Sequence, residues 1–325
     1  MMNGPAAIRV EKLSHHYGPR QALRELDLEI GAGEIFAVLG PNGGGKTTLF
    51  RLLSTLIPMQ SGSVQIFDAD LRKQTAEVRA AIGVVFQAPS LDRKLTVAEN
   101  IRHQAALYGL FGSEQRRRQA ELLEQFSLAD RANELTEKLS GGLRRRVELA
   151  KGLIHHPRLL LLDEPSTGLD PGARNDLWRY LRQLRGTLGT TIVLTTHFLD
   201  EADAADRIAI LHEGRLVALD TPDALRRQVG GDAISIETSR PEALAAAVQA
   251  QLALEARVVD GTLRLEVPDG HRWISRLVEA FPGQIDSIRL GKPTLEDVFI
   301  ARTGQRFLAA ASGGRLPLDD VRGQR

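Results

Sequence analysis

The sequence predicts an α/β fold followed by a second, smaller α+β unit, and three observations support this prediction. Short apolar runs alternate with helical stretches, which is typical of a sheet covered by helices. A glycine-rich loop near residue 43 stands between one of these runs and a helix. After about residue 230 the order changes to strand, helix, strand, strand, helix, strand, which is the ferredoxin-like order.

Two alternating stretches near the N-terminus predict half-buried, antiparallel strands. Their apolar residues are Ile8, Val10 and Leu13 in the first stretch and Leu26, Leu28 and Ile30 in the second. Between them we expect a loop over residues 15–21, because Gly18 and Pro19 stand together there. The apolar runs 64–67 and 82–86 predict further strands.

The glycine-rich loop follows the apolar run 35–39 and precedes leucines at helical spacing. Gly40, Gly45, Lys46 and Thr47 match the spacing G-x-x-x-x-G-K-[ST] of a phosphate-binding P-loop. Such a loop brings backbone N–H groups to a triphosphate, while Lys46 reaches the β- and γ-phosphates and Thr47 holds Mg²⁺. The alternative, a glycine-rich turn without a ligand, is disfavoured by the strand–loop–helix context. The residues expected to contact the nucleotide are Gly40, Pro41, Asn42, Gly43, Gly44, Gly45, Lys46, Thr47 and Thr48.

Two carboxylates follow the four leucines at 159–162, which predict a buried strand. Asp163, at the end of this strand, is expected to hold Mg²⁺ through water, since Mg²⁺ keeps most of its hydration shell. Glu164 is one residue further and is expected to orient or deprotonate the attacking water. The alternative is a pair of solvated carboxylates at a strand–loop junction, which the four leucines before them disfavour.

A second glycine pair stands further along the chain. Residues 96–126 have a helical pattern, and the segment LSGG follows at 139–142. Ser140 is suited to cap the next helix, and Gly141 and Gly142 expose N–H groups at its positive end. The chain therefore carries a second candidate anion site.

The second unit is predicted over residues 231–303. We expect strands at 234–236, 256–259, 262–267 and 285–290, and helices at 241–252 and 271–280. From about Gly304 the chain is rich in glycine and arginine, so a disordered tail is expected over residues 304–325.

Composition excludes several classes of protein. The chain has 42 basic and 41 acidic residues, and this balance argues against bulk binding of nucleic acid. It contains no cysteine, so disulfides and thiolate metal sites are excluded. No apolar run approaches the roughly 20 residues of a membrane span, and the N-terminus lacks the apolar core of a signal peptide. We therefore expect a cytoplasmic chain whose membrane role comes through a partner.

Together the motifs form an ordered set that resembles the nucleotide-binding subunit of ATP-binding cassette (ABC) transporters. The set consists of Tyr17, GPNGGGKTT, Gln87, LSGG, LLLLDEP, GLD ending at Asp170, and His197. The resemblance covers roughly residues 6–230 and implies ATP and Mg²⁺ as cofactors. It also implies a P-loop NTPase with a RecA-like core, an antiparallel β subdomain and a helical subdomain at about residues 88–155.

The resemblance assigns roles that the residue types alone leave open. Tyr17 is similar to the aromatic residue that stacks on adenine in this family. Gln87 is similar to the glutamine that contacts Mg²⁺ or the attacking water, and His197 to the histidine that contacts the γ-phosphate. The expected catalytic residues are Lys46, Gln87, Glu164 and His197, and the expected metal ligands are Thr47, Gln87 and Asp163. The histidine pairs at 15–16 and 155–156 have no third ligand at metal spacing, so surface or packing roles are expected.

The resemblance also implies a homodimer that encloses two ATP molecules. In the family, the LSGG segment faces the γ-phosphate bound by the other protomer. Here that segment consists of Leu139, Ser140, Gly141 and Gly142. Asp170 is similar to the residue of the loop that crosses between the two sites. Leu143 stands where the motif commonly ends in glutamine, which leaves the contacts of that glutamine open.

The segment PTLEDVFIARTG at 293–304, with the small second unit, resembles the daunorubicin-resistance type of exporter ATPase. Subunits of that branch pair with a separate permease, which implies a location on the cytoplasmic face of the cell membrane. Arg144, Arg145 and Arg146 fit the branch, and the alternative for any one of them is a solvated helix face.

Two other functions stay open at this stage. A soluble ABC ATPase could act on ribosomes or DNA, although such proteins usually carry two cassettes or long coiled coils, and this chain has one cassette. A regulatory cassette would bind ATP without turnover, which the presence of Glu164 and His197 disfavours. An ATPase assay and the identity of co-purifying partners distinguish the three.

Overall fold

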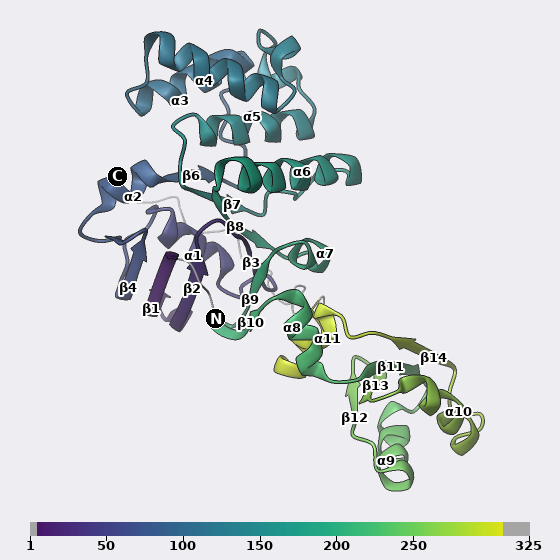
Figure 1. Ribbon diagram of the computed structural model, residues 1–325. Helices are drawn as coiled ribbons and strands as arrows, with labels where there is room; N and C mark the ends of the chain where they lie inside the picture. Colours follow the sequence, from purple (N-terminus) through teal and green to yellow (C-terminus); the bar gives the residue numbers. More distant parts are fainter. Residues whose placement is uncertain (1–4, 308–325) are drawn as a thin grey trace.

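The computed structural model describes residues 5–307 in two parts, a larger body and a smaller unit. Figure 1 shows that two helices, α8 (Pro222–Val229) and α11 (Leu295–Thr303), lie where the two parts meet. Within the described residues, no helix is both long enough and apolar enough to cross a membrane.

A six-stranded sheet forms the centre of the larger body. Its spatial order is β10 (Arg215–Asp220), β9 (Arg207–His212), β3 (Ile35–Leu39), β8 (Thr191–Thr196), β7 (Leu159–Asp163) and β6 (Ile82–Val85). Neighbouring strands pair in parallel except β10, which is antiparallel to β9. In β7, Leu160 and Leu162 join one core cluster while Leu159 and Leu161 join the other. Such a strand is buried on both faces, which explains its uninterrupted run of leucines.

A four-stranded antiparallel sheet packs with α1 (Lys46–Leu53) against one face of the central sheet. Its order is β2 (Arg20–Gly31), β1 (Ala6–Tyr17), β4 (Ser61–Ile66) and β5 (Ala69–Asp70). The antiparallel pairing of the first two strands is confirmed. The loop expected over residues 15–21 is shorter, because both strands continue to a two-residue turn at Gly18 and Pro19.

Helices cover the other side of the body. They are α3 (Val97–Leu107), α4 (Gly112–Gln125), the 3₁₀ turns η1 (Ala129–Arg131) and η2 (Thr136–Lys138), α5 (Gly141–Leu153) and α6 (Pro171–Leu188). The predicted helical stretch is confirmed, and it breaks between residues 107 and 112. The start of α3 is fixed by a capping box between Thr96 and Glu99. Two further short helices, α2 (Thr75–Ala81) and α7 (Leu199–Asp203), have too few apolar residues to give a periodic signal.

The smaller unit has its own antiparallel sheet and its own core cluster. Along the chain its elements are β11 (Asp232–Glu237), α9 (Pro241–Leu252), β12 (Ala256–Val259), β13 (Thr262–Val267), α10 (Gly270–Ala280) and β14 (Ser287–Gly291). The sheet order is β12-β13-β11-β14. Ile234, Leu263 and Leu265 point to the face on which the core residues of α9 and α10 pack.

The end of the described chain differs from the expectation. Leu295, Val298 and Phe299 of α11 pack in the core cluster of the larger body, not in that of the smaller unit. Phe307, which falls in the tail expected to be disordered, is 1% exposed, and its ring lies 5.0 Å from that of Phe299. The chain therefore returns to the larger body after the second sheet. The rest of the expected tail, 308–325, lies outside the described residues.

Candidate active site

The P-loop connects β3 to α1, as the sequence predicts. Gly45 has φ 108°, and a Cβ there would lie 2.9 Å from the carbonyl oxygen of Ala22. Glycine is required at this position because an L-side chain would be both strained and crowded. Two hydrogen bonds hold the loop: Gly44 N–H donates to Pro41 O at 3.1 Å, and Gly214 N–H donates to Gly44 O at 3.0 Å.

Lys46 begins α1 and is 4% exposed. Its Nζ donates to the carbonyl oxygens of Gly40 at 2.8 Å and Pro41 at 3.1 Å. It also lies 3.6 Å from Glu164 Oε1. Burial lowers the pKa of Lys46, while the carboxylates of Glu164 and Asp163 oppose this shift. The loop, the ammonium group and a buried carboxylate are therefore already in contact.

A cavity of about 500 Å³ opens beside this loop. Its volume suits a small ligand such as a nucleotide. Its lining consists of Tyr17, Arg20, Ala22, Pro41, Asn42, Gly43, Gly45, Lys46, Thr47, Thr48, Arg51 and Glu164. Tyr17 is 43% exposed, so its ring is available to a ligand. Arg20 and Arg51 add positive charge that the sequence motifs did not indicate.

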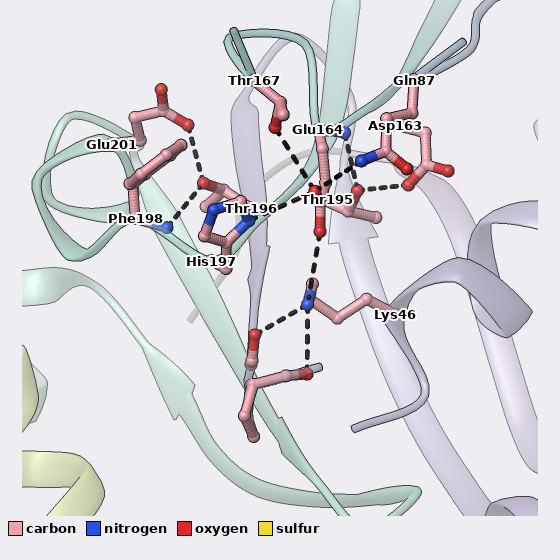
Figure 2. A network of polar contacts seen from close by, with 12 residues as sticks. Lys46, Gln87, Asp163, Glu164, Thr167, Thr195, Thr196, His197, Phe198 and Glu201 are labelled. Carbon is pink, nitrogen blue, oxygen red and sulfur yellow. Dashed lines mark hydrogen bonds and ion pairs between the residues drawn. The ribbon is translucent and has the colours of Figure 1, made fainter. Parts of the chain in front are cut away.

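Asp163 and Glu164 stand where β7 ends, next to the end of β8 (Figure 2). The hydroxyl of Thr195, on β8, donates to Asp163 Oδ1 at 2.6 Å and accepts from Glu164 N–H at 3.0 Å. Burial raises the pKa of Asp163, and the hydrogen bond from Thr195 opposes this shift. Thr195 thus positions both acidic residues. A buried threonine at the end of the neighbouring strand was the available signal, but strand pairing was needed to interpret it.

Three other predicted residues converge on the carboxylate of Glu164 (Figure 2). Gln87 Nε2 donates to Glu164 Oε2 at 3.1 Å. His197 Nδ1 lies 3.2 Å from the same oxygen, and Lys46 lies at the other oxygen. Glu164 itself has φ 43°, an uncommon conformation for this residue type that turns the chain sharply at the strand end. The structure therefore brings together Lys46, Gln87, Glu164 and His197 around one carboxylate.

The loop of His197 is held by residues that the sequence did not single out. Thr196 Oγ1 donates to Glu201 Oε2 at 2.7 Å and accepts from Phe198 N–H at 3.0 Å. The rings of His197 and Phe198 lie 4.1 Å apart. Glu201 is 2% exposed, which makes this anchor independent of solvent. Since Glu201 lies on the short helix α7, only the fold reveals its contact with Thr196.

The LSGG segment and Asp170 do not line this cavity. Ser140 caps α5 as predicted, with its Oγ accepting from Leu143 N–H at 3.3 Å. Asp170 caps α6, with Oδ1 accepting from Ala173 N–H at 2.9 Å. A Cβ on Gly141 would meet no atom within 4 Å. The starts of α5 and α6 therefore lie outside the cavity beside the P-loop of the same chain.

The donor set fits a magnesium ion better than a transition metal. Thr47, Asp163 and Gln87 offer hydroxyl, carboxylate and amide oxygens, which are the hard donors that Mg²⁺ prefers. Within residues 5–307 no group of three or more His, Cys, Asp or Glu side chains could hold a metal ion. His155 instead packs, with its ring stacked 3.7 Å from that of Tyr108.

Comparison with known proteins agrees with this geometry. The ABC transporter family profile matches residues 23–167. The daunorubicin resistance ATP-binding protein DrrA2 of Streptomyces coeruleorubidus is 39% identical over 313 residues, covering 92% of this chain and 96% of that protein. The chain belongs to the ABC transporter family. The Nod factor export ATP-binding protein I of Rhizobium johnstonii is 37% identical, covering 93% of this chain and 96% of that protein.

A solved structure supports membership of this family at the level of the fold. The structure of cbiO1 from Clostridium perfringens, described as part of the ABC transporter complex cbiONQ, superposes with a TM-score of 0.64. It is 28% identical and covers 76% of this chain and 96% of cbiO1. This ABC ATPase therefore has the P-loop NTPase fold predicted for its larger part, it binds ATP through that fold, and it is an enzyme of the ATPase class.

Proposed function

We propose that this ABC ATPase hydrolyses Mg²⁺-ATP in the cavity beside the P-loop and drives a separate permease for export. The observation that carries this proposal is the convergence of Lys46, Gln87 and His197 on the carboxylate of Glu164. Export is supported by the two relatives, which are named for daunorubicin resistance and for Nod factor export. With a permease as partner, the subunit would lie on the cytoplasmic face of the membrane.

The residues of the cavity divide the work of binding. Tyr17 stacks on adenine, the loop from Gly40 to Thr48 binds the phosphates through backbone N–H groups, and Lys46 contacts the β- and γ-phosphates. Thr47, Asp163 and Gln87 would hold Mg²⁺, which would supply positive charge that offsets the negative charge of the triphosphate.

Glu164 performs the proton chemistry in this proposal. It orients a water molecule for attack on the γ-phosphorus and accepts its proton while the bond to the β-phosphate oxygen breaks. His197 contacts the γ-phosphate from the neighbouring strand end. His197 Nδ1 lies 3.2 Å from Glu164 Oε2. A γ-phosphate bound between the P-loop and these two side chains would therefore contact both.

A second copy of the chain completes the site. Leu139, Ser140, Gly141 and Gly142 of one protomer face the γ-phosphate bound by the other, and Asp170 lies between the two sites. Converting a mostly open pair into a mostly closed one takes about 5.5 kcal/mol of differential binding. Charge-assisted hydrogen bonds contribute about 1.5–3 kcal/mol each, so a few per site suffice. Loss of the γ-phosphate on hydrolysis then reopens the pair.

The domain organisation is part of the proposal. We assign residues 6–230 to the ATPase domain, with a helical subdomain at about 88–155. We assign a ferredoxin-like fold to the smaller unit, because its sheet order β14-β11-β13-β12 and its six elements fit that fold. Helix α11 ends the predicted range 231–303 but packs on the ATPase domain.

The substitution Glu164→Gln tests the hydrolytic role. Turnover should fall by roughly 100-fold or more, because a general base contributes that much. ATP binding should persist, and an ATP-bound dimer should accumulate in size-exclusion chromatography. Glu121→Gln, an exposed carboxylate on α4, is the matched control and should leave turnover unchanged. Wild-type turnover in Glu164→Gln would remove Glu164 from the mechanism.

Purification of the tagged chain from membranes tests the partner. A membrane-spanning protein should co-purify with it. Recovery of ribosomes or DNA as the main partner would instead favour a soluble ABC ATPase that acts on nucleic acid assemblies.

A further inference from the structure

The three arginines after the LSGG glycines have three different partners. Arg144 Nη1 donates to the carbonyl oxygen of Leu139 at 2.6 Å. Arg146 Nη2 donates to Asp176 Oδ2, on α6, at 2.5 Å. Arg145 is 7% exposed, so a solvated helix face is wrong for this residue. Its buried charge needs an explanation, because an arginine is rarely buried without a specific partner.

Arg145 and Glu148 together grip the backbone on both sides of Gln87. Arg145 Nη1 donates to Phe86 O at 2.8 Å and to Glu148 Oε2 at 2.9 Å, and Nη2 donates to Gln87 O at 3.4 Å. Glu148 Oε1 accepts from Ser90 N–H at 2.7 Å. The pair therefore connects one turn of α5 to the segment 86–90, which we call the Gln87 segment.

The same helix face makes one more contact with the Gln87 segment. Lys151, three residues after Glu148, donates from Nζ to Ser90 O at 2.6 Å. Ser90 is thus held at its N–H by Glu148 and at its carbonyl oxygen by Lys151. The side chains of Arg145 and Glu148 are 8% and 3% exposed, so water competes little for these bonds.

Stability alone does not account for such a pair. A buried ion pair is often replaceable by apolar residues without loss of stability, because desolvation offsets the attraction between the charges. What apolar residues could not supply is the set of directed hydrogen bonds to Phe86 O, Gln87 O and Ser90 N–H. Bonds that involve charged groups are shorter and stronger than neutral ones, so this connection is stiff.

We propose that Arg145 and Glu148 are positioning residues that make α5 and the Gln87 segment move as one unit. Helix α5 begins at Gly141 and is capped by Ser140, and Gln87 Nε2 lies 3.1 Å from Glu164 Oε2. A displacement of the helix start would therefore shift Gln87 relative to Glu164. The inference rests on the proposed function. It means that movement of the LSGG segment at the start of α5 would be transmitted through Gln87 to Glu164 of the same chain.

The test uses the full-length chain with the double substitution Arg145→Met and Glu148→Gln. This variant is neutral at both positions, which avoids leaving one buried charge unpaired. The matched control is Arg117→Met, which removes an exposed arginine of α4 that pairs with Glu114 and Glu121. Arg145→Lys is a second variant that keeps the charge but loses the two-nitrogen geometry, in case the double variant folds poorly.

Hydrogen exchange reports the connection directly. Amide exchange at Ser90 should be about tenfold faster in the double variant and unchanged in Arg117→Met, because the acceptor geometry at Glu148 is lost. In Arg145→Lys the increase should be smaller. Unchanged exchange at residues 87–90 in both Arg145 variants would overturn the proposal.

Kinetics report the consequence for catalysis. At saturating ATP, kcat should fall about tenfold while ATP affinity stays constant, since misplacement of a catalytic group costs turnover. In a Gln87→Ala background the double substitution should cause no further loss of kcat. A full additional loss there would overturn the proposal. If Gln87→Ala alone keeps wild-type turnover, the assigned role of Gln87 has failed, and the exchange experiment still decides whether the connection exists.

Discussion

The two glycine-bearing loops of this chain differ in what surrounds them. In the P-loop, a Cβ on Gly40 would lie 2.4 Å from Leu211 O, and one on Gly45 would lie 2.9 Å from Ala22 O. In the LSGG segment, a Cβ on Gly141 would meet nothing within 4 Å. The first loop is enclosed by its own chain, whereas Gly141 of the second is exposed to solvent.

This difference separates glycines that the folded protomer itself requires from glycines whose requirement would come from another molecule. The P-loop glycines are explained by the folded protomer, because only glycine fits their backbone angles and neighbours. Gly141 of the LSGG segment has no such explanation inside the protomer, whereas a Cβ on Gly142 would lie 3.0 Å from Ala173 Cβ of α6. An open helix start with free N–H groups is suited to an anion, and here that anion would come from outside the chain's own cavity.

The largest effect is expected for Gly45→Val. The new side chain would clash with Ala22 and Leu23 and would strain a φ of 108°, so the loop must move. Loss of two charge-assisted hydrogen bonds to phosphate corresponds to roughly 1,000-fold weaker ATP binding. Equilibrium binding of a fluorescent ATP analogue measures this. If Gly45→Val kept the wild-type affinity for ATP, the close packing around the P-loop would not be needed for nucleotide binding.

A discriminating effect is expected for Gly141→Asp. In the isolated protomer an acidic residue in the first turn of α5 is tolerated or slightly stabilising, because it faces the positive end of the helix. In an ATP-bound dimer the same carboxylate would oppose the γ-phosphate, and like-charge contacts cost several kcal/mol. Turnover should therefore fall roughly 100-fold while the melting temperature and ATP binding to the monomer stay unchanged.

Ala at the same position is the control for Gly141→Asp. Gly141→Ala adds a methyl group without charge, and the space around it is open. It should retain most of the turnover. If Gly141→Asp is fully active as well, no anion approaches this loop and the comparison with the P-loop fails.

A smaller effect is expected for Thr195→Val, which acts inside the enclosed site. The substitution keeps the shape but removes the bond to Asp163 and the acceptor for Glu164 N–H. We expect kcat to fall about tenfold, because each lost bond in a buried site costs about 1 kcal/mol or more.

The pH dependence gives Thr195→Val its own signature. Burial already raises the pKa of Asp163, and the Thr195 hydroxyl counteracts that shift. Without the hydroxyl the pKa of Asp163 rises further, so the acid limb of the pH–rate profile should move to higher pH. Thr195→Ser should restore both the rate and the profile, whereas a purely structural loss would leave the position of the limb unchanged.

Sequence alone predicted the parts of the site that depend on local chemistry. The P-loop and the two carboxylates at the end of β7 follow from residue types at fixed spacing, and the fold places them as expected. Thr195 and Glu201 escaped detection because their roles come from the pairing of β8 and the position of α7. A single buried threonine or glutamate has no periodic signature before the neighbouring element is known.

Arg145 and α11 illustrate the same limit over longer distances. The sequence left a solvated helix face open for any one of the three arginines, but the backbone oxygens that Arg145 contacts lie more than fifty residues earlier in the sequence. The prediction of a disordered tail missed the burial of Phe307. This residue packs against Phe299 after the chain has left the second sheet. In both cases tertiary contacts, not composition, decided the outcome.

The smallest effect is expected at the anchored end of α5, opposite its open start. His155 follows this helix, stacks on Tyr108 at 3.7 Å and has Nε2 2.9 Å from Ile82 O. Burial lowers the pKa of His155 to about 4, while an unfolded histidine titrates near 6.5. The unfolded chain therefore binds more protons between these values, and stability is complete above pH 6.5 and is lost as pH falls towards 4.

The substitution His155→Phe keeps an aromatic stack and removes this titration. Relative to pH 7, the wild-type protein should lose about 1–2 kcal/mol more unfolding free energy at pH 5 than the variant. Urea denaturation at the two pH values measures the difference, and His103→Phe, at an exposed position of α3, is the matched control. Equal pH dependence in all three proteins would mean that the far end of α5 is not anchored through a neutral His155. The comparison between the exposed start of α5 and its anchored C-terminal end would then no longer hold.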